Sequence, residues 1–467
     1  MSITTSSAEA RQLYLQAVDK AENLELDAAA KLADQAIAKD PDFAMAYLLR
    51  GQSGTGFVAF RENMDKAVSL VDKVSPGERH WILAAKAQAD GDMVGLKSEL
   101  DQLGRLFPGD KHVQLRLARH HRGPMQNARQ AVVHYQKATA IDPSYAAAYN
   151  ELGYAQAALD DYKGAEASFQ KYIELLPASP NPYDSYAEFL MKVGRYDDSI
   201  AQYRKALEKN PAFLSALAGI GTNQVFKKEF EAARQTFEEQ RAKSPDLDTQ
   251  LNALEHVAMS FVHEGKPAEA VRVFDDIASR AEAGQLAPRV VNAHIDAAFV
   301  LSQTGNGNGA GAQVDKAAAA LAAASLPPAV KDRMERQTTL ARARVLAAQG
   351  QTREAVAEVA KVQPAIEKRQ IPAEVRALNE VRGTVALKQK RYRTALAHFA
   401  KADDQSPFVM YQRAVAAGRL GQQRLAASLL DKVANWNVND LGYALVRQGA
   451  TDKAAAVAVA TSGKRRP

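Results

Sequence analysis

Prolines recur at a nearly constant spacing through the first half of this chain. Seven of them are separated by 35, 32, 35, 34, 34 and 34 residues. A fixed period near 34 indicates a chain built by stacking structural repeats. The length of 467 residues agrees, because it exceeds what one hydrophobic core usually organises. The prolines are Pro41, Pro76, Pro108, Pro143, Pro177, Pro211 and Pro245.

The residues between these prolines repeat as well. With each proline at position 32 of a 34-residue unit, small residues fall at positions 8 and 20, and aromatic residues at positions 17 and 24. Small residues let two antiparallel helices approach closely, and aromatic rings fill the space between neighbouring pairs. The proline then ends the second helix, which it cannot continue. Three consecutive units share Gly153, Ala187 and Gly221 at position 8 and Phe169, Tyr203 and Phe237 at position 24.

This pattern resembles the tetratricopeptide repeat, with Tyr149, Leu152, Gly153, Ala165, Phe169 and Pro177 in matching positions. The resemblance implies an all-α fold, a right-handed superhelical solenoid of antiparallel helix pairs. The abundance of Ala, Leu, Glu, Gln, Lys and Arg agrees with helices, and no segment is a convincing strand. The chain is also similar to bacterial tetratricopeptide proteins of unassigned function that end in a Trp-Asn segment, here residues 434–437.

The regularity of the repeat divides the chain into three segments. We expect divergent helix pairs over residues 1–111, a regular array over 112–247 and degenerate repeats over 248–467. Ser75-Pro76-Gly77-Glu78 predicts a capping box that opens a helix. The pattern returns in the unit ending at Pro407, where Gly383 and Phe399 occupy the expected places. Between them we expect helices near 247–263, 267–282, 287–303, 328–349, 353–368 and 374–389, with residues 305–309 as one of the breaks.

The sequence contains little that points to catalysis or metal binding. The absence of Cys excludes disulfides, thiolate metal sites and cysteine nucleophiles. None of the nine histidines forms an HExxH pattern, and the adjacent His120 and His121 point to different sides of a helix. The glycine-rich residues 51–56 and 305–311 lack the Gly-Lys-Ser/Thr of a phosphate loop, so we expect them to connect helices. We therefore expect no catalytic residue, no metal and no cofactor.

Charge and hydropathy argue against nucleic-acid and membrane partners. The formal charge of +6 is small for the length, and both signs are interleaved. The one concentrated basic cluster, Lys464 to Arg466, is interpreted as a solvated terminus. The longest apolar stretches are far shorter than the roughly 20 residues of a membrane-spanning helix, so we expect a soluble protein. The first seven residues lack a signal-peptide pattern, which predicts a cytoplasmic protein if Met1 is the native start and a periplasmic one if a signal was removed.

The resemblance implies that binding residues lie on the concave face, on the first helix of each pair. Each of them is equally well interpreted alone as part of a solvated helix face. Together they place aromatic side chains and an Arg on one surface, as binding hot spots do. Some tetratricopeptide domains bind acidic peptide tails with a clamp of Lys, Asn and Arg side chains. Here Asp184 and Glu188 lie in the middle of the predicted groove, so we expect it to bind a neutral or basic peptide instead. The predicted groove residues are Arg116, His120, Asn150, Tyr154, Asp184, Glu188, Lys192, Thr222 and Phe226.

Two functions remain open at this point. The leading hypothesis is a non-catalytic scaffold that holds a peptide, a partner protein or a second copy of the chain. The alternative is an enzyme or small-ligand-binding protein whose site lies in the irregular part after Pro245.

Overall fold

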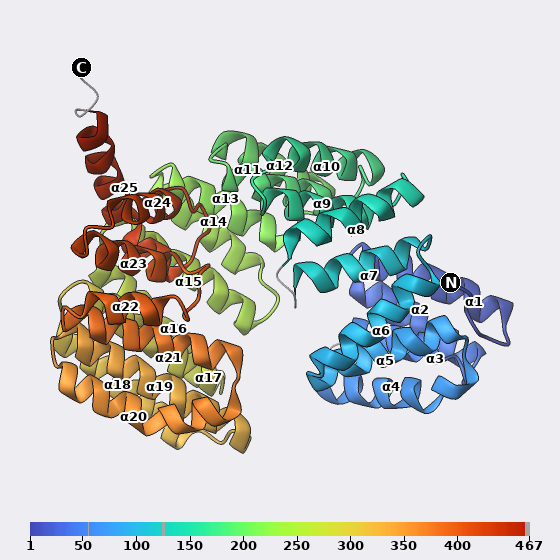
Figure 1. Cartoon of the computed structure of the whole chain (residues 1–467), viewed down its shortest axis with the longest axis horizontal. Coiled ribbons are helices and arrows are strands. Elements are labelled where there is room, and N and C mark those ends of the chain that lie inside the picture. Colours follow the sequence, from blue (N-terminus) through green and yellow to red (C-terminus); the bar gives the residue numbers. More distant parts are fainter. Residues whose placement is uncertain (55, 124–126, 463–467) are drawn as a thin grey trace. The chain divides into compact units, whose positions relative to one another are not determined.

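The computed structural model describes residues 1–54, 56–123 and 127–462, the side chains of residues 57, 58 and 455–462 excepted (Figure 1). Thr55 of the first glycine-rich stretch and the basic cluster Lys464 to Arg466 lie outside the described residues. The described residues fold into α-helices and one 3-10 turn, with no strand among them. Within the same residues, no helix combines the length and hydropathy needed to cross a membrane. The predicted fold class, an all-α solenoid of antiparallel helix pairs, is confirmed.

The chain divides into two compact units, Met1–Phe189 and Leu190–Pro467. This division falls inside one helix of the segment 112–247, and the three-segment division by repeat regularity stays a prediction. In the first unit, consecutive helices pack side by side as hairpins (Figure 1). They are α1 (Ala8–Glu22), α2 (Leu26–Lys39), α3 (Ala44–Ser53), α4 (Phe57–Ser69), α5 (Pro76–Asp90), α6 (Met93–Leu106), α7 (Lys111–Arg122), α8 (Ala128–Ile141), α9 (Ala146–Ala157), α10 (Tyr162–Leu175) and most of α11 (Asn181–Lys192).

The second unit continues the stacking of hairpins and ends on a helix that turns back onto earlier ones. This last helix, α25, contacts α15, α17 and α23 as well as its neighbour α24. The helices are α12 (Tyr196–Lys209), α13 (Leu214–Phe226), α14 (Phe230–Lys243), α15 (Leu247–Glu264), α16 (Pro267–Ala283), α17 (Ala287–Gln303), α18 (Gly307–Ala323), α19 (Pro328–Ala348), α20 (Thr352–Arg369), α21 (Pro372–Lys388), α22 (Tyr392–Phe399), α23 (Pro407–Arg419), α24 (Gln423–Ala434) and α25 (Leu441–Ser462).

The periodic prolines sit in tight turns between one hairpin and the next. In the turn Asp142–Tyr145, the Tyr145 N–H donates to the Asp142 carbonyl at 3.0 Å, and Pro143 takes the second position, for which its fixed φ is suited. The Asp142 side chain also accepts the Ser144 N–H at 2.9 Å. The same arrangement recurs where Asp40 and Asn210 precede a proline, with a turn bond of 3.1 and 3.0 Å. The prolines at these three turns, Pro41, Pro143 and Pro211, therefore follow the end of a second helix, as predicted, whereas Pro76 opens α5.

Glycine and phenylalanine form the contact that closes each regular hairpin. A Cβ atom on Gly153 would lie 2.8 Å from the Phe169 ring, closer than real Cβ contacts. The corresponding distances are 2.2 Å from Gly221 to Phe237 and 2.5 Å from Gly383 to Phe399. All three rings are fully buried. The predicted close approach of two helices at a small residue is confirmed, including in the degenerate part of the chain.

Three local predictions have different outcomes. The capping box is confirmed, because the Ser75 N–H donates to Glu78 at 3.0 Å and α5 begins at Pro76. The connection expected at residues 305–311 is wrong, since α18 begins at Gly307, with Asn306 accepting the Gly309 N–H at 3.0 Å. Pro407 opens α23 instead of ending a helix, because α22 already ends at Phe399 and Ser406 caps the next helix.

Substitution of Gly221 by Ala tests the closing contact. We expect a loss of about 1–3 kcal/mol in the free energy of unfolding, because the new methyl group overlaps the Phe237 ring. Gly311→Ala in α18 is the control, since its Cβ meets nothing within 4 Å, and it should stabilise the helix by about 0.5–1 kcal/mol. Thermal unfolding followed by circular dichroism measures both, and similar shifts for the two variants would contradict the packing argument.

Candidate functional site

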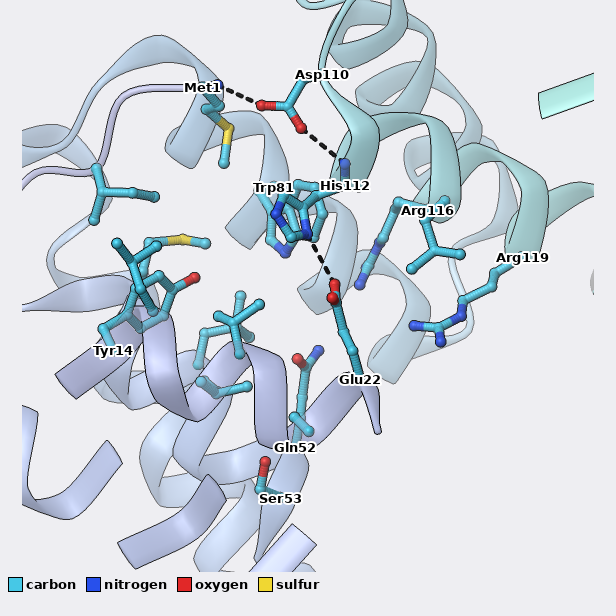
Figure 2. Close-up of a pocket in the computed structure, with 18 of the residues that line it drawn as sticks. Met1, Tyr14, Glu22, Gln52, Ser53, Trp81, Asp110, His112, Arg116 and Arg119 are labelled. Carbon is cyan, nitrogen blue, oxygen red and sulfur yellow. Dashed lines mark hydrogen bonds and ion pairs between the residues drawn. The ribbon is translucent and has the colours of Figure 1, made fainter. Parts of the chain in front are cut away.

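The first helices of the hairpins in the first unit, α1, α3, α5 and α7, line a pocket of about 510 Å3 (Figure 2). Ligand pockets commonly occupy about 300–1,000 Å3 and combine an apolar lining with a few polar groups. The apolar lining includes Leu15, Val18, Leu48, Leu49, Trp81, Leu96, Leu100 and Leu115. The polar and charged lining includes Arg11, Glu22, Gln52, Asp110, His112, Arg116, Arg119 and His120.

Helix α7 supplies most of the charged groups. Asp110 caps it by accepting the N–H groups of His112 and Val113 at 2.9 and 3.1 Å. Val113 and Ala118 are fully buried and hold the helix between its neighbours. Residues four apart share one face of a helix, so 112, 116 and 120 point together, and all three line the pocket.

Most of the charges around the pocket have partners within the first unit. Glu22 accepts a hydrogen bond from the Tyr145 hydroxyl at 2.6 Å and lies 2.8 Å from His112 Nδ1. The N-terminal ammonium of Met1 forms an ion pair with Asp110. Arg119 pairs with Glu151 at 3.2 Å. Figure 2 shows Glu22 and Gln52 reaching toward Trp81, His112 and Arg116 across the pocket.

Arg116 contains a buried polar atom without such a partner, because its Nη2 atom has no hydrogen-bond partner among the described residues. Its guanidinium carbon lies 5.3 Å from the centre of the Trp81 ring, at cation–π distance. Burial, and next the charge of Arg119, lower the pKa of Arg116 to about 10, so the group stays a cation at neutral pH. The pocket therefore contains an unpaired positive charge beside an aromatic face.

His120, one helical turn further along α7, is also a buried group without a partner. Its side chain is 7% exposed, and its Nδ1 atom has no hydrogen-bond partner among the described residues. Burial, then the neighbouring His121, lower the pKa of His120, which favours the neutral ring.

Two leucines leave apolar surface exposed at the pocket. Leu15 of α1 is 49% exposed and Leu26 of α2 is 45% exposed, although both line the cavity. Single exposed leucines are ordinary, but two of them at an apolar pocket add to a continuous apolar surface.

The other predicted groove residues of the first unit lie on α9 and α11. The Tyr154 hydroxyl donates to Glu188, and its ring packs edge-on against Phe169 with centroids 5.0 Å apart. Asn150 has a buried Oδ1 atom without a hydrogen-bond partner among the described residues. Asp184 is 9% exposed. The argument for a basic ligand weakens, because Glu188 is engaged by Tyr154 and Asp184 is buried.

Lys192, Thr222 and Phe226 belong to the second unit, where the C-terminal part of the chain covers Phe226. The guanidinium of Arg447 lies 4.7 Å from the Phe226 ring centre, and the ring of Tyr443 packs against it at 5.9 Å. Phe226 is 4% exposed and Thr222 is 6% exposed. The Lys192 carbonyl accepts a hydrogen bond from the Asn437 side chain at 3.2 Å. Phe226 is thus a core residue here, in contact with the chain's own C-terminal segment.

The sequence interpretation did not include the pocket residues from α1, α3 and α5. Its register came from the units ending at Pro143 to Pro245, and the spacings of 35 and 32 residues on either side of Pro76 break that register for the positions upstream. The rule that first helices line the inner face would have selected them, had it been extended to α1, α3 and α5. The two exposed leucines carry no signal in sequence, because exposure follows from packing.

A group of titratable side chains lies in the second unit, on α15, α17 and α19. Arg289 binds Glu255 and Asp248 at 2.9 and 2.7 Å, and Arg344 pairs with Glu380 on α21 at 2.7 Å. Burial, followed by the charge of Glu255, raises the pKa of Asp296 to about 7, against a smaller opposing effect of Arg344. A second cavity, of about 200 Å3, lies between α20, α21 and α22 and includes none of these groups. The described residues contain no His, Asp and Glu cluster able to hold a metal ion.

Substitution of Phe226 by Ala separates a core residue from a binding residue. We expect a loss of about 3–5 kcal/mol in the stability of the second unit, because a buried ring that contacts Tyr443 and Arg447 is removed. Chemical denaturation measures this loss. A variant as stable as the parent would contradict the assignment of Phe226 to the core.

Substitution of Asp296 by Asn removes a pH-dependent cost. A carboxyl with a raised pKa binds its proton more tightly in the folded state, so the stability of the parent falls as pH rises from about 4 to about 7. Asp296→Asn should lose this component and be more stable than the parent at pH 8, by about 1–3 kcal/mol. Denaturation at pH 5 and pH 8 measures the difference. Parallel pH profiles for parent and variant would contradict it.

Comparisons with known proteins agree with this architecture. Family models match residues 127–160, described as TPR repeat, and residues 146–178 and 189–247, described as tetratricopeptide repeat. No curated protein matches the sequence.

Solved structures resemble parts of the chain. A crystal structure of MamA is 21% identical and covers 36% of this chain and 91% of its own, with a TM-score of 0.32. YrrB, described as a TPR protein with an unusual peptide-binding site, is 17% identical to this chain. The match covers 38% of this chain and 89% of YrrB, with a TM-score of 0.29. PilF of Pseudomonas aeruginosa is 16% identical to this chain. The match covers 44% of this chain and 88% of PilF, with a TM-score of 0.33. Such low values carry no information about partners. The three family matches, which fall on helix hairpins, show that residues 127–178 and 189–247 contain tetratricopeptide repeats.

Proposed function

We propose that this protein is a non-catalytic scaffold that binds a peptide segment of a partner protein on the inner face of its first unit. The observation that carries the proposal is the pocket of about 510 Å3 between α1, α3, α5 and α7, with apolar side chains on its walls. Tetratricopeptide repeats generally serve protein–protein interaction, which supports the same reading. The partner segment can belong to another protein or to a second copy of the chain.

The size and lining of the pocket favour a peptide. It combines several leucines and one Trp with polar and charged side chains, a mixed lining that suits a peptide with both apolar and polar side chains. Two of its polar members on α7, His112 and Arg119, are held in fixed contacts with Glu22 and Glu151. Such groups orient a ligand better than they exchange protons with one.

The alternative, an enzyme or small-ligand protein with a site after Pro245, has weaker support. Asp296 and Glu255, both half-buried, have raised pKa values, as catalytic groups often do. Structural ion-pair networks perturb pKa values in the same way, and the cavity described in that half lies at other residues. We therefore interpret these two acids as part of the internal packing of the second unit.

Replacement of the two exposed leucines tests the proposed binding surface. The double variant Leu15→Ser with Leu26→Ser should bind peptides at least tenfold more weakly, since two apolar contacts are worth about 1.4 kcal/mol or more. The measurement is titration of the full chain with the best binders from a random peptide library. Folding should be unaffected, because both side chains are already nearly half exposed, at 49% and 45%.

Val94→Ser provides the matched control. Val94 is 82% exposed at the start of α6 and does not line the pocket, so its loss should leave peptide affinity unchanged. Equal affinities for the parent and the double leucine variant would show that peptides bind elsewhere. A chain that selects no peptide at all would contradict the proposed function itself.

A further inference from the structure

The charges around the pocket of the first unit do not balance. Of its two acids, Asp110 is held by the cap of α7 and by the Met1 ammonium. Glu22 is held by His112 and Tyr145. Arg119 is neutralised by Glu151. Arg116 remains without an ion-pair partner among the described residues, and its Nη2 atom is buried.

An unpaired buried cation carries a cost that a ligand can remove. The Nη2 atom of Arg116 has lost its water without gaining a hydrogen bond among the described residues. The Trp81 face at 5.3 Å compensates for part of this loss, because its π electrons attract a cation. A carboxylate compensates for more, since it accepts two parallel N–H bonds from the planar guanidinium.

The surroundings of Arg116 define the rest of the ligand. Leu96, Leu100 and Leu115 line the same pocket, and none of them offers a hydrogen bond. A group that reaches Arg116 must therefore carry apolar atoms beside its charge. The exposed side chains of Leu15 and Leu26 extend this apolar surface beyond the cavity itself, which suits a chain segment with several side chains.

On this basis we propose that the pocket selects an amphipathic peptide segment in which a carboxylate, from Asp, Glu or a free C-terminus, lies next to large apolar side chains and pairs with Arg116. The inference rests on the proposed function, and it names the chemistry of the partner. It also replaces the expectation of a neutral or basic peptide, which relied on Asp184 and Glu188 being free.

The experiment compares matched peptides on the full chain. Fifteen-residue peptides combine Leu and Phe with Asp, Asn or Lys at one flanking position, each with a free and with an amidated C-terminus. Fluorescence anisotropy measures their affinity. We expect peptides with a carboxylate, from Asp or from a free C-terminus, to bind at least tenfold more tightly than amidated peptides with Asn, and those with Lys to bind most weakly.

Variants of Arg116 assign the preference to this side chain. Arg116→Met should abolish the difference between Asp and Asn peptides, whereas Arg116→Lys, which keeps the charge without the planar fork, should retain part of it. Arg105→Met is the matched control, because Arg105 is exposed on α6 and does not line the pocket, so the preference should persist. Circular dichroism establishes that each variant is folded.

The outcomes separate the two proposals. Peptides that bind the parent without regard to charge, or a preference for Asp that survives Arg116→Met, would overturn the role of Arg116 and leave the scaffold function standing. Failure of every peptide to bind would overturn both. If Arg116→Met does not fold, Arg116→Lys decides, because an undiminished preference in that variant is incompatible with a bidentate pairing.

Discussion

The close approach of helices at glycine is the contact on which the rest of this structure depends. At Gly153 the missing side chain leaves room for the Phe169 ring, and a Cβ atom would lie within 2.8 Å of it. The ring is completely buried, so it also contributes apolar area to the hairpin. The same glycine–phenylalanine pair, with the two residues sixteen positions apart, recurs at Gly221 with Phe237 and at Gly383 with Phe399. Hairpins in both units therefore close in the same way. In the first unit, the first helices α1, α3, α5 and α7 line one pocket.

The surface formed by the first helices is covered by the chain itself in the second unit and lines a cavity in the first. In the second unit, α25 returns against α15, α17 and α23, and Tyr443 and Arg447 cover Phe226. Tyr443 is fully buried, so this coverage belongs to the core. In the first unit the corresponding helices leave a cavity with Leu15 and Leu26 still exposed. Covering an apolar surface stabilises a protein, and in the first unit the described residues leave part of this surface uncovered, which is where we propose that a peptide binds.

Much of the fold could be predicted from sequence because its determinants are local. The turn at Pro143 needs four consecutive residues, and the pairing of Gly153 with Phe169 needs one hairpin. The position of Phe226 could not be predicted, since its cover comes from Arg447, 221 residues further along the chain. Arg116 and His120 were placed on the inner face by their position in α7. The sequence does not show whether a charged side chain on that face has an ion-pair or hydrogen-bond partner. Arg119 pairs with Glu151, whereas the Nη2 atom of Arg116 has no partner among the described residues.

The unpaired charge of Arg116 determines what the pocket excludes as much as what it admits. A neutral apolar ligand would displace the remaining water around the guanidinium without replacing its hydrogen bonds, and that loss opposes the gain from apolar contact. A cationic ligand would add repulsion from Arg116 to the same loss. Only a ligand that combines apolar surface with a negatively charged hydrogen-bond acceptor avoids both the lost hydrogen bonds and the charge repulsion. Under the proposed pairing, selectivity in this pocket follows from Arg116, because the acids Glu22 and Asp110 are already bound to His112 and to the N-terminus of α7.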